Sequence, residues 1–194
     1  MFHSFDYYIL KILHDFAVAT GNHFTPFLRA ISYFCDSHAF FPIIWISILL
    51  IIIKKTRKVG VAMLLAIIIN ALLTNLGLKN IIGRLRPYQS GISDYYAWWK
   101  YVGGLMMREY SFPSGHVSTA MAAMTSIFFY GNKKYSWLAF LFVIMMGFSR
   151  NYLMVHYPSD VIGGIVIGLL AAIIAHIIID KYYNRIFNNS VEQK

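Results

Sequence analysis

Five long apolar runs that carry very few charges constrain this 194-residue chain more than any other feature. A helix that crosses a lipid bilayer needs about 20 mostly apolar residues, with a range of roughly 17–25. Only 13% of the residues are charged, whereas an ordinary soluble domain has about 25%. The sequence therefore predicts an all-α integral membrane protein, a helical bundle with five transmembrane segments near residues 38–54, 59–81, 115–131, 135–150 and 158–180.

The first 37 residues are predicted to lie on the membrane surface. The segment 5–19 carries Asp6, Lys11, His14 and Asp15 among aromatic and aliphatic residues, a pattern typical of an amphipathic helix in the interface. A sixth span from this region is the alternative, and it would have to bury those charges. We therefore expect one domain over 1–194, made of interfacial N-terminal helices at 1–37, the transmembrane bundle at 38–180 and a cytoplasmic tail at 181–194.

The net charge of +9 is concentrated in short segments that flank the apolar runs. Basic residues lie at 54–58, at 133–134 and after the last run, and short basic loops mark the cytoplasmic side of a multi-pass protein. Such loops favour anionic lipid as a partner, and nucleic-acid binding is not expected. With these segments inside, residues 82–114 and 151–157 both fall on the outer face of a plasma membrane.

The outer segment 88–111 is rich in tyrosine and tryptophan. Aromatic residues gather at the headgroup level of membranes, so we interpret most of these side chains as an interfacial belt. A lid or a vestibule for a lipid tail is the alternative function of this segment.

The first polar cluster is KNIIGRLRP, at the outer end of the second run, with Lys79, Arg84, Arg86 and Pro87. Lys79 and Arg86 are seven residues apart, so a continuing helix would present both on one face before Pro87 ends it. Two cations at a helix end are also typical of side chains that reach for the interface. Arg84 lies off that face and receives no role.

The second cluster, SFPSGH at 111–116, directly precedes the third run. Ser114 is expected to cap a helix, and Gly115 leaves room for an oxygen atom to approach the backbone. The free N–H groups and the positive end of the helix dipole favour an anion there, to which His116 in the first turn could donate a proton. An ordinary capped helix with an interfacial histidine is the alternative.

The third cluster, SRNYLMVHYPSD at 149–160, joins the fourth and fifth runs. Arg150 ends one predicted helix, Asp160 lies in the first turn of the next, and His156 sits just before it. An aspartate that accepts a bond from one ring nitrogen fixes the histidine tautomer and leaves the other nitrogen free to attack. An Arg–Asp pair that pins the loop is the alternative, although ionisable groups at a membrane boundary are costly to hold without a function.

The predicted topology puts all three clusters at helix ends on the outer face, where the bundle can bring them together. The combined set holds cations, two histidines and a single carboxylate, which is not the group of oxygen ligands that Mg²⁺ or Ca²⁺ requires. No metal or other cofactor is expected. The set suits a phosphate: Lys79, Arg86 and Arg150 would neutralise its oxygens, one histidine would attack phosphorus and the other would protonate the leaving oxygen.

The three clusters resemble the signatures of the type 2 phosphatidic acid phosphatase superfamily, whose fold is shared with vanadium haloperoxidases. KNIIGRLRP matches Lys-x6-Arg-Pro, PSGH matches the second signature, and SRNYLMVHYPSD matches Ser-Arg-x5-His-x3-Asp. The motif residues span 79–160, and three signatures in order make the match specific. The resemblance implies a metal-independent phosphatase or diphosphatase that acts on a phosphorylated lipid at the outer, periplasmic face of a bacterial inner membrane.

Carried over position by position, the resemblance implies that His156 is the nucleophile that forms a phosphohistidine and that Asp160 orients it. His116 would be the general acid for the leaving group and afterwards the base for water. The phosphate would be held by the other signature residues, which are Lys79, Arg86, Ser114, Gly115 and Arg150.

Members of this size hydrolyse undecaprenyl diphosphate, phosphatidylglycerophosphate, phosphatidic acid or lipid A phosphates. Dedicated undecaprenyl diphosphatases of one bacterial subgroup carry Asp or Asn where this chain has Gly115. A transporter or flippase is the alternative from another class, because Asn70, Thr74 and Asn75 lie within the second run and polar groups near the midplane can line a substrate path. An inactive relative that only binds lipid phosphate would lack a catalytic residue, and none is missing.

Overall fold

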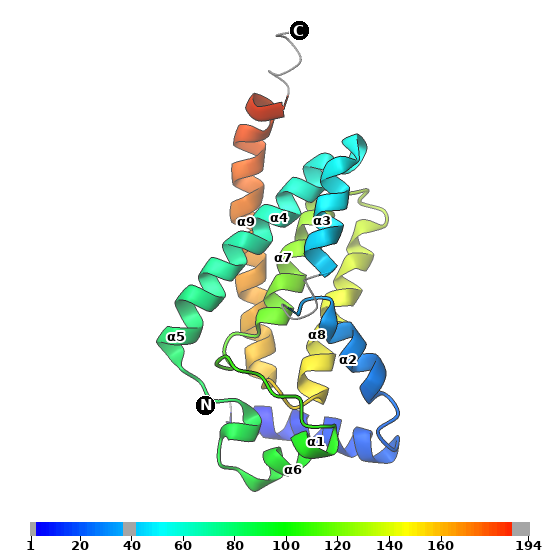
Figure 1. Ribbon diagram of the computed structural model, residues 1–194, viewed down its shortest axis with the longest axis vertical. Coiled ribbons are helices and arrows are strands. Elements are labelled where there is room, and N and C mark those ends of the chain that lie inside the picture. Colours follow the sequence, from blue (N-terminus) through cyan, green and yellow to red (C-terminus); the bar gives the residue numbers. More distant parts are fainter. Residues whose placement is uncertain (1–2, 37–41, 188–194) are drawn as a thin grey trace.

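A computed structural model describes residues 3–36 and 42–187, and within these ranges the chain forms helices and loops with no β-strand (Figure 1). The α-helices are α1 (His3–Ala19), α2 (Thr25–Tyr33), α3 (Pro42–Ile52), α4 (Arg57–Ala71), α5 (Lys79–Ile82), α6 (Ser93–Tyr101), α7 (Gly115–Tyr130), α8 (Ala139–Tyr152) and α9 (Pro158–Phe187). Short 3₁₀ turns lie at η2 (Lys54–Thr56), η4 (Pro87–Gln89) and η5 (Ser136–Leu138). The predicted all-α fold class is confirmed.

The centre of the bundle is formed by α4, α7 and α9, which pack against one another, with α3 beside α4 and α8 beside α7. Small residues let these helices approach closely. A Cβ atom on Gly168 of α9 would clash with the carbonyl oxygen of Ser118, and one on Gly164 would lie 2.8 Å from that of Ser114. Buried alanines from all three helices complete the contact: Ala66, Ala122, Ala171, Ala172 and Ala175. This packing fixes the start of α9 against the start of α7.

The helix α4 continues without a break through η3 (Leu72–Leu78), a π-helical segment, into α5. π-helical turns are rare and often occur at functional sites. The rod ends at Ile82, because Gly83 takes a left-handed conformation with φ 61° that favours glycine. The predicted helix up to Pro87 is therefore too long, and residues 83–86 form a connecting segment.

The predicted apolar runs correspond to α3, the rod α4–α5, α7, α8 and α9. Two helical stretches, Lys54–Gln89 and Pro158–Tyr183, are long and apolar enough to cross a membrane, and α3 is a shorter apolar helix. Large apolar side chains such as Leu76, Ile144 and Ile177 point away from the bundle. The number of transmembrane segments stays a prediction, and residues 38–41 of the first predicted run lie outside the described residues.

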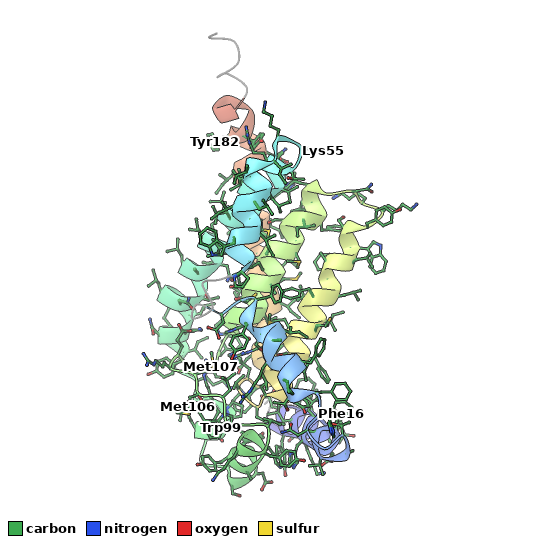
Figure 2. The ribbon with its side chains drawn as sticks, turned by 45° about the vertical axis from the view of Figure 1, so that its right-hand side comes forward. Phe16, Lys55, Trp99, Met106, Met107 and Tyr182 are labelled. Carbon is green, nitrogen blue, oxygen red and sulfur yellow. The ribbon has the colours of Figure 1, made fainter. Side chains whose placement is uncertain are left out.

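The helices α1 and α6 lie across one end of the bundle (Figure 1). Figure 2 places Trp99 of α6 at this end and Lys55 and Tyr182 at the opposite end. Leu10, Leu13 and Ala17 of α1 are buried in the main core, as an amphipathic helix predicts. Asp6 departs from that pattern, since its side chain is fully buried instead of lying on the polar face.

Candidate active site

The structure brings the three predicted clusters together at the end of the bundle that α1 and α6 cover (Figure 1). Each cluster is placed by a helix terminus: the first by the end of the π-helical rod, the second by the start of α7, and the third by the end of α8 and the start of α9. All the predicted site residues except Gly115, which is half-buried, are buried: Lys79, Arg86, Ser114, His116, Arg150, His156 and Asp160.

The imidazole of His156 lies between a carboxylate and a guanidinium. Its Nδ1 atom is 3.5 Å from Oδ2 of Asp160, and its Nε2 atom is 3.2 Å from Nη1 of Arg86. Asp160 is held in turn by the backbone N–H of Tyr157, which donates to Oδ2 over 2.9 Å, and by the hydroxyl of Ser111. The carboxylate therefore faces one ring nitrogen, and the other ring nitrogen faces the cations.

The environment of His156 favours a neutral ring. The side chain is buried, and Arg86 and Arg150 lie nearby, so desolvation first and the two guanidinium charges second hold the pKa of His156 well below its ordinary range. A neutral imidazole whose proton sits on the nitrogen beside Asp160 keeps a lone pair on Nε2. This is the protonation state that a nucleophile needs.

Buried polar atoms without hydrogen-bond partners line the site. Arg150 is fully buried, and within the described residues Nε, Nη1 and Nη2 of its guanidinium have no hydrogen-bond partner. The same holds for Oγ of Ser114 and Nε2 of His116. A buried charge without compensation is costly, so this arrangement is suited to an anion that accepts bonds from these donors.

Two features of the start of α7 keep the anion site open. Ser114 occupies the predicted N-cap position, but its hydroxyl makes no capping bond, so the oxygen is available to a ligand. A Cβ atom on Gly115 would lie 3.3 Å from Nζ of Lys79, a close approach that a side chain would disturb. The N–H groups of the first turn of α7 lie beside this space and favour an anion.

Arg86 is fixed by the backbone around it. Its Nη1 donates to the carbonyl oxygen of Val155 over 2.7 Å, and its Nε donates to that of Glu109 over 2.8 Å. Lys79 and Arg86 thus meet at the site, as predicted. The reason is different from the one predicted, because the helix ends at Ile82 and the connecting segment, not a shared helix face, carries Arg86 to the site.

Arg84, for which no role was predicted, hydrogen-bonds a carboxylate of the site. Its guanidinium donates to Oδ1 of Asp160 over 2.6 Å and to Oδ2 of Asp6 over 2.7 Å. Asp6 also accepts bonds from the backbone N–H and the hydroxyl of Ser159. The N-terminal helix α1 is therefore tied to the carboxylate that faces His156, and the prediction of an unused Arg84 is wrong.

Two further carboxylates approach the cations and histidines of the site. Glu109, in the loop after α6, forms an ion pair with Lys79, and Oδ2 of Asp36 lies 3.9 Å from Nε2 of His116. Neither residue belongs to a periodic or spaced pattern. The one signal in the sequence was their position in segments predicted to lie on the outer face.

Comparisons with known proteins agree with this arrangement. The family model of the PAP2 superfamily matches residues 57–183. The undecaprenyl-diphosphatase of Sulfolobus acidocaldarius is 27% identical over 166 residues, which cover 85% of this chain and 74% of that protein. The lipid A 4'-phosphatase of Porphyromonas gingivalis is 30% identical over 182 residues, which cover 90% of this chain and 75% of that protein.

Two crystal structures share the fold. Aquifex aeolicus LpxE superposes with a TM-score of 0.64 and 25% identity over 78% of this chain and 84% of that one. A transmembrane PAP2-type phosphatidylglycerolphosphate phosphatase from Bacillus subtilis gives a TM-score of 0.62 and 22% identity over 93% of this chain and 98% of that one. The helix-end clusters, the fold and the family match over residues 57–183 agree, and the chain belongs to the PAP2 superfamily.

Proposed function

We propose that this protein is a membrane lipid phosphatase that hydrolyses a phosphomonoester or diphosphate on a lipid headgroup through a phosphohistidine at His156. The observation that carries the proposal is the position of His156, a buried imidazole with Asp160 beside its Nδ1 and Arg86 beside its Nε2. Arg150, whose guanidinium has no hydrogen-bond partner within the described residues, is the second cation near the ring. Relatives that are named for lipid A and undecaprenyl diphosphate support the substrate class.

In the first half of the reaction, Nε2 of His156 attacks phosphorus and the bond to the leaving oxygen breaks. Arg150, Lys79 and the start of α7 stabilise the charge on the phosphate oxygens as it develops. The leaving oxygen takes a proton from His116 and departs as the lipid alcohol or lipid monophosphate. The phosphorylated imidazole keeps its Nδ1 proton beside Asp160, whose negative charge stabilises the ring.

In the second half, water attacks phosphorus on the phosphohistidine. His116, which lost its proton in the first half, accepts one from the water, and the P–N bond breaks so that its electrons return to Nε2 of His156. Inorganic phosphate leaves and both histidines regain their starting states. The cations Lys79, Arg86 and Arg150 supply the positive charge that a metal ion gives other phosphatases, so we propose a metal-independent reaction.

We also propose that the site faces the periplasmic side of a bacterial inner membrane. The basic segment around Lys55 lies at the end of the bundle opposite to Trp99 (Figure 2), and basic segments stay in the cytoplasm. The aromatic helix α6 and the helix α1 would then lie at the outer headgroup level, where aromatic side chains are favoured.

The function is tested by phosphate release from the purified protein in detergent, with EDTA present. The substrates are undecaprenyl diphosphate, phosphatidylglycerophosphate and phosphatidic acid. We expect release from at least one of them at the same rate with and without EDTA, together with a protein-bound phosphate that is labile in acid and stable in base. No release from any lipid, or release that EDTA abolishes and Mg²⁺ restores, would contradict the proposal.

The depressed pKa of His156 predicts how its charge responds to pH. An exposed histidine with a pKa of about 6.5 is roughly 90% protonated at pH 5.5, whereas His156 is expected to stay neutral there. The ¹⁵N shifts of the His156 ring, assigned by comparison with His156→Ala, should therefore show the Nδ1–H tautomer at both pH 7.5 and pH 5.5. In the unfolded chain this histidine binds a proton at low pH, whereas in the folded site it does not. The free energy of unfolding should therefore fall as the pH drops below about 6.5. An imidazolium signal at pH 5.5 would disprove the neutral ring.

A further inference from the structure

A cavity of about 340 Å³ opens beside the anion site, within the range of small-ligand sites, which starts near 300 Å³. One wall comes from the π-helical rod, with Asn75, Lys79 and Asn80, and the other from the loop after α6, with Arg108, Glu109 and Tyr110. None of these residues except Lys79 has been given a role in the reaction.

The cavity is continuous with the place of the reacting phosphate. Lys79 lines the cavity, and its Nζ atom would be 3.3 Å from a Cβ atom on Gly115. Oδ1 of Asn75 would lie 4.0 Å from the same point. A phosphate that binds at the start of α7 therefore has the cavity as its direct neighbour, and a substituent on that phosphate extends into it.

An apolar surface adjoins the cavity on its other side. Leu85, in the connecting segment after the rod, lines the cavity and is 53% exposed, and Leu76 and Ile81 on the rod are 73% and 79% exposed. Aliphatic side chains on this surface suit the acyl or prenyl tail of a lipid. A lipid whose tail lies along the rod thus places the portion of its headgroup next to the tail in the cavity and its terminal phosphate at His156.

The charges in the cavity favour an anion in that position. Glu109 neutralises Lys79, while Arg108 makes no hydrogen bond or ion pair with any described residue. Asn75, Asn80 and Tyr110 add neutral polar groups. When the reacting phosphate takes over Lys79, Arg108 is the remaining cation of the cavity lining, and a guanidinium can bind a phosphate with two parallel hydrogen bonds.

We propose that this cavity binds a second phosphate, the one between the lipid tail and the reacting phosphate, so that the substrate class is a lipid diphosphate. The proposal rests on the proposed phosphatase function and narrows it. His156 attacks the terminal phosphorus, and the bond from this phosphorus to the bridging oxygen breaks. The bridging oxygen stays on the inner phosphate, which leaves as the lipid monophosphate while Arg108 holds it, and water later releases inorganic phosphate from His156.

The test compares two substrates with the same tail, a C15 prenyl diphosphate and the matching C15 prenyl monophosphate. For Arg108→Gln we expect the ratio of kcat/KM for the diphosphate to kcat/KM for the monophosphate to fall about 10-fold or more, because a charge-assisted pair with the inner phosphate is lost. Lys100→Gln is the matched control, since Lys100 is an exposed cation on α6 outside the cavity, and it should keep the wild-type ratio.

Soluble inhibitors give a second measurement that does not depend on the tail. Pyrophosphate should inhibit the wild-type protein more strongly than orthophosphate, and Arg108→Gln should remove most of that difference. If wild type hydrolyses both lipids but Arg108→Gln behaves like Lys100→Gln, the cavity does not bind the second phosphate and the phosphatase function stands. If the wild-type protein releases phosphate from neither prenyl lipid and from none of the three lipids named under the proposed function, the phosphatase function itself fails.

Discussion

Replacement of His156 by alanine is expected to slow phosphate release by roughly 10⁴- to 10⁶-fold, the loss found when a covalent nucleophile is removed. The lone pair on Nε2 of His156 is directed at the cations of the site, since Nε2 lies 3.2 Å from Nη1 of Arg86. Without it, water would have to attack the lipid phosphate directly. Phosphate release by the best lipid substrate and acid-labile phosphate on the protein should both disappear.

Two other histidine variants show whether the loss of labelling is specific to His156. His116→Ala should also release phosphate slowly, because it removes both the acid of the first half of the reaction and the base of the second. It should still become labelled, since the nucleophile is intact. His23→Ala is the matched control, since His23 is an exposed residue in the turn between α1 and α2, and it should leave activity intact. Labelling of His156→Ala, or release that survives in it, would assign the nucleophile to another residue.

The parts of the site that the sequence predicts correctly are those that follow from helix ends. Lys79, His116, Arg150 and His156 lie within or next to the terminal turns of apolar helices, and a membrane topology that puts those ends on one face is enough to bring them together. The boundaries of the helices were harder to predict, because the left-handed Gly83 ends the rod at Ile82 although the apolar pattern continues to Leu85.

The residues that the sequence did not reveal are those paired across long distances in the chain. Asp6 meets Arg84 across 78 positions, and Glu109 meets Lys79 across 30. Such pairs leave no periodicity. A charged residue in an amphipathic helix is normally taken to lie on its polar face, so Asp6 is recognised as buried only when the packing of α1 against α8 and α9 is known.

The pairing of Asp6, Arg84 and Asp160 carries the second large prediction. Arg84 is the cation that hydrogen-bonds the two buried carboxylates, and its side chain is 29% exposed whereas both aspartates are fully buried. Arg84→Gln would leave two buried negative charges without this partner, a loss of about 3–5 kcal/mol. For a chain of this size, that loss lowers the melting temperature by roughly 6–20 °C.

The same substitution is expected to act on catalysis through Asp160 and not through substrate binding. Arg84 holds Oδ1 of Asp160, which leaves Oδ2 for Tyr157 and the ring of His156. If Asp160 loses this anchor, the imidazole loses its orientation, so kcat should fall about 10²-fold while KM changes little. If Arg84 had only a structural role, the substitution would lower the amount of active protein and leave the rate per labelled site unchanged. Single-turnover labelling distinguishes these two results.

Asp6→Asn tests the part that the N-terminal helix α1 plays, because it removes one of the two carboxylates that share Arg84 while it keeps the shape of the side chain. Combined with Arg84→Gln, Asp6→Asn should cost much less than it does alone, since the cation that it pairs with is already gone. Lys58→Gln breaks an exposed ion pair with Asp180 at the opposite end of the bundle and should change stability by at most about 1 kcal/mol. Additive effects of Asp6→Asn and Arg84→Gln on stability and kcat would mean that α1 only covers the bundle. Strong coupling would make α1 a working part of the catalytic site, joined to its nucleophile through two carboxylates and one arginine.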